Sequence, residues 1–173
     1  VESDKVAETP TVGFPNHIHT FKQLDSYAVT ATTTQLHIWS QASNRNHHLV
    51  SEILLPPFMT ITCLDIYSGT LLVGTNIGIM LAVSISQREI LHQIQVHHGK
   101  IECLTVDHNQ VITGGEDGYL RILSCSDGTL LREIHAHNES VTSVACRGDI
   151  LCSGSCGGIV KTWRLSSGKQ RHE

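Results

Sequence analysis

The chain contains 173 residues, of which 40% are hydrophobic, a size and composition that allow a substantial buried core. Sixteen acidic and twelve basic residues leave a formal net charge of −4, and without a basic run nucleic acid is not an expected partner. The six cysteines are too sparse for a disulfide scaffold, so they predict free thiols in an intracellular protein, cytoplasmic or also nuclear.

Residues 1–17 are polar and irregular, and we expect a linker or flexible segment there. From residue 18 onward a unit of about forty residues recurs, which predicts four repeats at about 18–55, 58–96, 98–135 and 138–173. The last three units share glycines at two fixed positions, Gly74, Gly114 and Gly154 at the first and Gly78, Gly118 and Gly158 at the second. The first unit is looser and ends in Trp39.

Each unit consists of short aliphatic or β-branched runs separated by turn residues, without helical periodicity. In the third unit we expect strands at 100–106, 110–115, 119–123 and 129–134, with an Asp-Gly hairpin turn at 117–118. The first two strands of a unit, as at 61–66, are apolar at nearly every position, which is typical of strands covered on both faces. These features predict an all-β fold, a β-propeller of about four blades. No membrane insertion is expected, because glycine and polar residues interrupt the longest apolar region.

Three further features recur with the repeat: a Ser/Thr-Gly step at 113–114 and 153–154, the Asp-Gly turn, and a closing tryptophan at Trp39 and Trp163. Together with the forty-residue spacing, they resemble the WD40 family of β-propellers. The resemblance implies a non-catalytic scaffold that binds a protein or peptide without a cofactor, as a regulatory or targeting module of a larger protein. It also implies a buried chain of polar side chains in each blade. The residues that match this chain are His97, Thr113 and Asp117 in the third unit and His137, Ser153 and Trp163 in the fourth.

Three chemical interpretations compete with this structural one. Histidine, aspartate and hydroxyl groups are those of a hydrolase, but here they recur in register with the repeat, which favours a structural role. The twelve histidines and the cysteines, including Cys152 and Cys156, lack the paired spacing of a zinc site, so no metal is expected. Residues 154–162 resemble a phosphate-binding loop, but Lys161 does not directly follow the second glycine, so a hairpin is expected.

The loops that carry the His and Asp positions should form one rim of the propeller, where a partner can bind. The candidate rim residues are Asn76, His98, Lys100, Glu102, Glu116, Asn138 and Glu139. An alternative function is the substrate receptor of a ubiquitin ligase, because the short first turns resemble those of F-box-associated WD40 proteins. A reader of phosphorylated peptides needs converging arginines, whereas the corresponding strand positions hold Thr62, Glu102 and Thr142. The glutamates of the rim favour a basic or neutral peptide instead.

The chain begins with Val1 and holds about four blades, whereas WD40 rings usually have about seven. We therefore expect an incomplete ring made of the C-terminal blades of a larger propeller, with the remaining blades of the parent protein as partners. Only a short segment follows Trp163, so the fourth unit is expected to lack an outer strand of its own.

Overall fold

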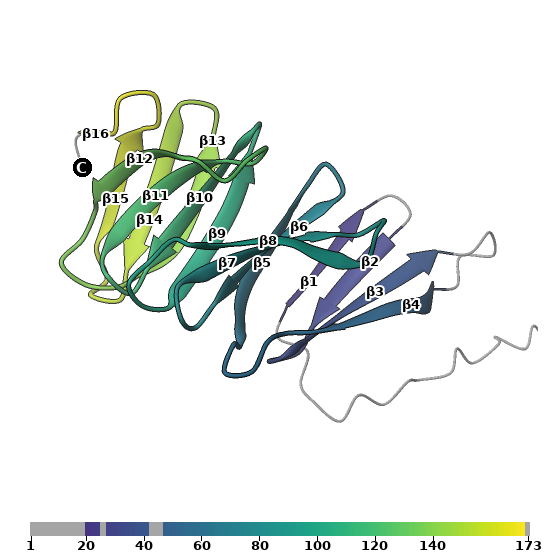
Figure 1. The fold of residues 1–173 in the computed structure, drawn as a ribbon. Coiled ribbons are helices and arrows are strands. Elements are labelled where there is room, and N and C mark those ends of the chain that lie inside the picture. Colours follow the sequence, from purple (N-terminus) through teal and green to yellow (C-terminus); the bar gives the residue numbers. More distant parts are fainter. Residues whose placement is uncertain (1–19, 25–26, 42–46, 172–173) are drawn as a thin grey trace, which may run out of the picture.

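A computed structural model describes residues 20–24, 27–41 and 47–171, and the linker expected at 1–17 lies outside this range. The described residues form sixteen strands and no helix. They make four antiparallel sheets, each built from four consecutive strands, and the sheets stand side by side as blades (Figure 1). The expected all-β fold with four blades is confirmed.

The strands follow the repeat in chain order. The first blade contains β1 (Thr20–Leu24), β2 (Tyr27–Ala31), β3 (Gln35–Gln41) and β4 (His47–Leu54). The second contains β5 (Ile61–Tyr67), β6 (Thr70–Thr75), β7 (Ile79–Ser84) and β8 (Glu89–Gln95). The third contains β9 (Ile101–Asp107), β10 (Gln110–Gly115), β11 (Tyr119–Ser124) and β12 (Leu130–His135). The fourth contains β13 (Val141–Arg147), β14 (Ile150–Ser155), β15 (Val160–Arg164) and β16 (Lys169–Arg171).

The recurring second glycine is explained by the turn before the third strand of a blade. Gly78 and Gly118 both have φ of +78°, in the left-handed region that other residues rarely adopt. A Cβ atom at Gly118 would also collide with the backbone carbonyl of His137, at the start of the next blade. Each turn is therefore held against the following loop, which fixes the spacing between neighbouring blades.

The core consists of three apolar layers, one between each pair of adjacent blades. Successive side chains of β6 alternate between two of these layers: Leu71 and Val73 pack against the first blade, whereas Leu72 packs against the third. This alternation explains why strands of the inner blades are apolar at nearly every position, because both of their faces are buried.

The fourth blade differs from the prediction at its outer edge. It does have an outer strand of its own, because β16 pairs with β15 through Thr162, Trp163 and Arg164. Gly168, with φ of +68°, allows the tight turn that brings the chain back. The three residues of β16 are all exposed and polar, so no apolar pattern in the sequence indicates this strand.

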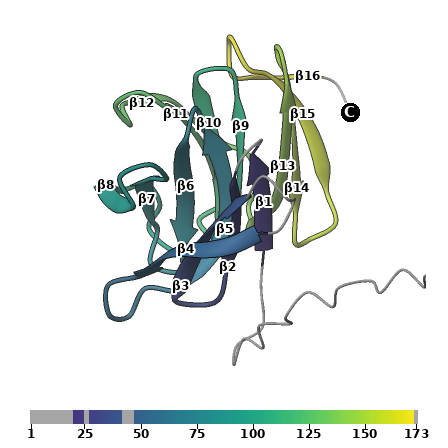
Figure 2. The ribbon, with the colours of Figure 1, turned by 90° about the vertical axis from the view of Figure 1, so that its right-hand side faces the viewer.

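The four described blades form an open arc, with the first and fourth blades at its two ends (Figures 1 and 2). The inner strands β5, β9 and β13 lie next to one another along the arc. The incomplete ring that the sequence predicts is therefore seen in the described residues.

Candidate functional site

A buried polar network in the third blade joins the three residues that the sequence singled out. His97 Nδ1 lies 2.9 Å from Asp117 Oδ1, and His97 Nε2 lies 2.8 Å from Thr113 Oγ1. Because a carboxylate can only accept, Nδ1 of the neutral ring carries the proton and Nε2 accepts from the Thr113 hydroxyl. The network thus links the loop before β9 to β10 and to the following turn.

Two residues that sequence reasoning missed complete this network. Arg121 donates from Nη1 to Asp117 Oδ2 at 2.6 Å and from Nε to Glu133 Oε2 at 2.7 Å. Its side chain is only 9% exposed, although arginine on a strand normally suggests a solvent-facing position. Pairing with two carboxylates satisfies the buried guanidinium and connects β11 to the outer strand β12.

The surroundings keep His97 neutral and Asp117 ionised. Burial lowers the pKa of His97 from its ordinary value and outweighs the nearby Asp117 carboxylate, which raises it. Partial burial acts to raise the pKa of Asp117, but hydrogen bonds from Arg121 and His97 outweigh it and lower the pKa to about 2.

The fourth blade contains a shorter version of the same network. Trp163 Nε1 donates to Ser153 Oγ at 2.9 Å, and Ser153 Oγ lies 2.8 Å from His137 Nε2. His137 Nδ1 is buried and has no hydrogen-bond partner among the described residues. Gly157 occupies the position that Asp117 holds in the third blade, so the acceptor for this nitrogen is missing.

The described part of the first blade contains a similar contact, which the sequence did not reveal: Trp39 Nε1 donates to Thr30 Oγ1 at 3.0 Å.

The rim candidates differ in how far their side chains are already engaged. Asn76 Oδ1 accepts from the Thr60 backbone N–H at 2.7 Å, and Glu116 Oε2 accepts from the Lys100 N–H at 3.1 Å. Both side chains therefore hold the loop that begins the first strand of their blade. The Lys100 ammonium, 43% exposed, pairs with Glu102 Oε2 at 2.7 Å, so the Glu102 carboxylate offsets its charge.

His98, Asn138 and Glu139 are the other rim candidates, and all three are exposed. The Glu139 carboxylate lies over Gly157, and Cys156 Sγ lies 3.5 Å from Glu139 Oε2. Because Lys100 and Glu102 offset each other, Glu116 and Glu139 leave the rim candidates with a net negative charge.

The fold of this chain is similar to that of several solved structures. No protein-family model and no curated protein matches the sequence. Among solved structures, the computationally designed Ika8 protein superimposes with a TM-score of 0.81 at 18% identity, covering 93% of this chain and 50% of Ika8. The RRP9 WD40 repeats match with a TM-score of 0.79 at 17% identity, covering 92% of this chain and 51% of theirs. The chain has the fold of a WD40 β-propeller.

The chain spans about half the length of these two structures. The designed Ika4 protein is closer in length, since 94% of it is covered along with 89% of this chain, with a TM-score of 0.80 and 21% identity.

Access to the polar groups limits the chemistry that the WD40 blades can perform. The Thr113 hydroxyl group belongs to a residue with no exposed surface, and Ser153 is 1% exposed. A nucleophile must reach the substrate carbonyl, which neither hydroxyl can do in this arrangement. The His–Asp–Thr set therefore has the composition but not the access of a hydrolase site.

The described range contains neither a metal-binding cluster nor a membrane-spanning helix. No cluster of three or more His, Cys, Asp or Glu side chains there could hold a metal ion. No described helix is long and apolar enough to cross a membrane. All six cysteines carry free thiols, with Cys156 exposed and the other five half-buried.

Proposed function

We propose that the chain is a non-catalytic scaffold for protein interactions, a regulatory or targeting module built from WD40 blades of a larger propeller. Two features of the described residues support this proposal. The histidines and hydroxyl groups of the two polar networks are buried within single blades, where His97 is bonded to Asp117 and Thr113, and His137 to Ser153. The fourth blade, by contrast, leaves exposed a face that is buried in the second and third.

In the second and third blades, a side chain of the next blade covers the glycine at the first fixed position of the repeat. A Cβ atom at Gly74 would lie 2.9 Å from Cγ2 of Ile101, and one at Gly114 would lie 2.7 Å from Cγ1 of Val141. In each case a branched side chain from the next blade sits directly over the glycine. Around a Cβ atom at Gly154, the described residues beyond its chain neighbours place within 4 Å only atoms of Ser143, which belongs to the same blade.

Hydrogen bonds repeat this difference. Thr62 Oγ1 donates across the blade boundary to the Ile101 carbonyl at 2.6 Å. Its counterpart in the fourth blade, Thr142, instead donates to the Gly154 carbonyl of its own blade at 3.3 Å. The threonine hydroxyl that bonds to the next blade at position 62 thus bonds within its own blade at position 142, where the described arc ends.

The open face has the size and polarity to accept a branched aliphatic side chain. A hollow of about 140 Å³ lies there, lined by Ser143, Val144, Ala145, Cys152, Ser153, Gly154 and Val160. Val160 is 67% exposed, a cost that burial against another blade would remove. The open face is the single observation that carries the proposal, and its partner is a further blade of the parent propeller.

If the chain serves instead as the substrate receptor of a ubiquitin ligase, its rim disfavours substrates that are recognised by a phosphate group. Lys100 is the only cation among the rim candidates, and it is paired with Glu102. An acidic rim favours basic or neutral peptides as additional ligands.

Cys152 provides a direct test because its thiol lines the open face, while Cys156 lies on the rim. We would measure maleimide labelling of both thiols in the full chain as its concentration rises. Association through the open face should slow labelling of Cys152 by at least tenfold and leave Cys156 unchanged. Equal labelling of both thiols at every concentration would contradict the proposal.

A further inference from the structure

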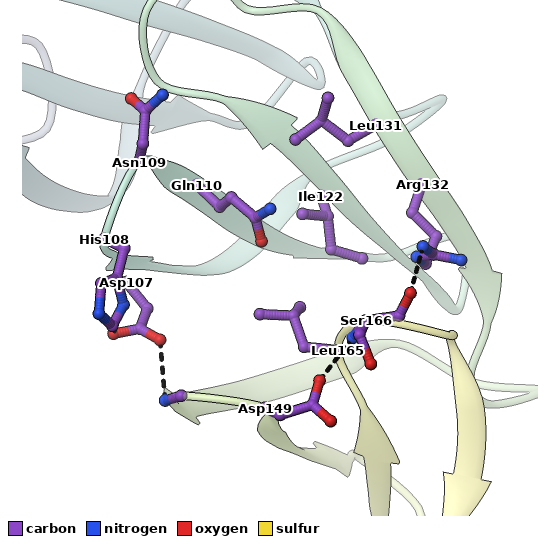
Figure 3. Close-up of a pocket in the computed structure, with 11 residues that line it drawn as sticks. Asp107, His108, Asn109, Gln110, Ile122, Leu131, Arg132, Asp149, Leu165 and Ser166 are labelled. Atoms are coloured by element: carbon purple, nitrogen blue, oxygen red, sulfur yellow. Dashed lines mark hydrogen bonds and ion pairs between the residues drawn. The ribbon is translucent and has the colours of Figure 1, made fainter.

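A second surface, at the end of the blades opposite the rim, has the features of a ligand site. A cavity of about 520 Å³ lies between the third and fourth blades, where the β9–β10, β13–β14 and β15–β16 turns meet (Figure 3). Its volume falls within the range of about 300–1,000 Å³ that is usual for ligand pockets.

The cavity combines an apolar floor with polar groups around its mouth. Ile122, Leu131 and Leu165 supply the floor, and Leu131 is 49% exposed. The carboxylates of Asp107 and Asp149 stand on the side formed by the turns (Figure 3). The lining also includes Arg132, whose guanidinium donates to the Ser166 carbonyl, so only the turn side, with its two carboxylates, favours a ligand with an apolar stem and a positively charged end.

Hydrogen bonds hold the walls in place. Asp107 Oδ2 accepts from the Gly148 N–H at 3.0 Å, and Asp149 Oδ1 accepts from the Ser166 N–H at 2.7 Å. Arg132 Nη2 donates to the Ser166 carbonyl at 2.7 Å and closes the far end. The Asp107 and Arg132 contacts join the two blades, and the Asp149 contact joins two turns of the fourth blade, so the cavity is preorganised for a ligand.

The Asp149 carboxylate accepts from Ser166 and lies near Arg164 and Arg171, and these groups together lower its pKa. Its Oδ2 atom lies 3.7 Å from Arg164 Nε, which is beyond hydrogen-bond distance, and the side chain is 53% exposed. Asp107 is more engaged, since its Oδ1 atom lies 3.1 Å from His108 Nδ1. Asp149 is thus the carboxylate best placed to pair with an incoming cation.

The preceding pair of blades shows that the fold does not require these carboxylates. A cavity of about 130 Å³ lies in the corresponding groove between the second and third blades, lined in part by Leu91, His92 and Cys125. At the positions equivalent to Asp107 and Asp149 the repeat there has Tyr67 and Asn109. The fourfold larger volume and the two carboxylates therefore distinguish this groove from the one between the second and third blades.

We propose that this groove binds an arginine of an extended segment in a protein partner. The methylene stem of the arginine lies over Ile122, Leu131 and Leu165, and its guanidinium pairs with Asp149 in place of the loosely positioned Arg164. The inference rests on the proposed scaffold function, but it uses a surface separate from both the rim and the open face.

The test uses the full chain and a defined probe, the peptide acetyl-Ala-Leu-Arg-Leu-Ala-amide, followed by amide chemical shifts in NMR. Shifts should concentrate at 107–110, 148–149 and 165–166, and binding should weaken as salt rises. A peptide with citrulline in place of arginine keeps the shape and loses the charge. It should bind at least tenfold more weakly.

Two protein variants isolate the charge and the floor. Asp149→Asn retains an oxygen for the Ser166 N–H, so the fold is preserved, and it should weaken the arginine peptide about tenfold. Leu131→Lys, at an exposed position, places a cation in the groove and should abolish binding. Asp127→Asn removes a charge outside the cavity and should have no effect.

Equal binding of the arginine and citrulline peptides, full affinity in Asp149→Asn, or shifts confined to the rim would overturn the groove assignment. None of those results would contradict the proposed scaffold function, which the labelling of Cys152 tests separately. The failure of one proposal can therefore be distinguished from the failure of the other.

Discussion

The substitution Asp117→Ala tests the role of the buried network in the third blade. The carboxylate accepts hydrogen bonds from His97 Nδ1, Arg121 Nη1 and the Tyr119 N–H. Removing it leaves the buried His97 N–H without its acceptor and Arg121 with Glu133 as its only carboxylate partner. The loss therefore affects two strands and the loop before the blade together.

The expected cost follows from the pKa of this carboxyl group. A folded pKa of about 2, against an ordinary value of 3.8, corresponds to at most about 2.4 kcal/mol at neutral pH. The Asp117 side chain is 15% exposed, so solvent screening reduces that figure. We expect Asp117→Ala to lower the free energy of unfolding by about 1–3 kcal/mol, because buried donors lose their acceptor. For a chain of this length, that corresponds to a Tm about 2–10 °C lower.

The same argument gives the pH dependence. A depressed pKa stabilises the folded state above pH 3.8, and that contribution disappears as the pH falls toward 2. Urea denaturation of wild type and Asp117→Ala should therefore show the full difference at pH 7 and a smaller one at pH 3, with the exposed Glu89→Gln as the control. Equal stability of wild type and variant at pH 7 would refute the structural role of Asp117.

Three further predictions follow from other positions. Gly157→Asp should stabilise the chain by about 1 kcal/mol in thermal unfolding, because it offers an acceptor to His137 Nδ1 once the Glu139 carboxylate moves aside; a lower Tm would count against this interpretation. Gly114→Ala should lower the free energy of unfolding by about 1–3 kcal/mol, because the new methyl group meets Val141. Gly154→Ala should be tolerated, since only the Ser143 hydroxyl must rotate. Equal effects of the two substitutions in urea denaturation would contradict an open fourth blade. Thiol titration of unfolded protein without reductant should find six free cysteines. In the folded chain at pH 8, Cys103 should react far more slowly than the exposed Cys156, because burial raises the pKa of Cys103 to about 12. The reverse order of labelling in mass spectrometry would be inconsistent with the fold.

Much of the fold was predictable because the same pattern of glycines and apolar runs recurs in several copies of the repeat. Glycines at a fixed spacing, such as Gly78 and Gly118, mark turns that need a left-handed backbone, and the apolar runs between them mark strands buried on both faces. The strand β16 was not predictable, because its exposed Lys, Gln and Arg form a hairpin without burying apolar surface.

The sequence revealed the buried network only in part. His97, Thr113 and Asp117 share the spacing of the repeat, but Arg121 does not: its role depends on Glu133, which only strand pairing brings beside it. The groove between the third and fourth blades was not foreseeable for a similar reason. Its lining comes from turns of two different repeats, and no sequence pattern within one repeat places Asp107 near the turn that carries Asp149.

The central claim, that the fourth blade presents a face for another blade, is tested most directly by the mass of the chain in solution. Light scattering over a range of concentrations should give a mass that rises above the 19.0 kDa of one chain. Val160→Glu places a charge on the open face and should restore 19.0 kDa without lowering the Tm. A protease-resistant wild-type chain of 19.0 kDa at every concentration would contradict the claim.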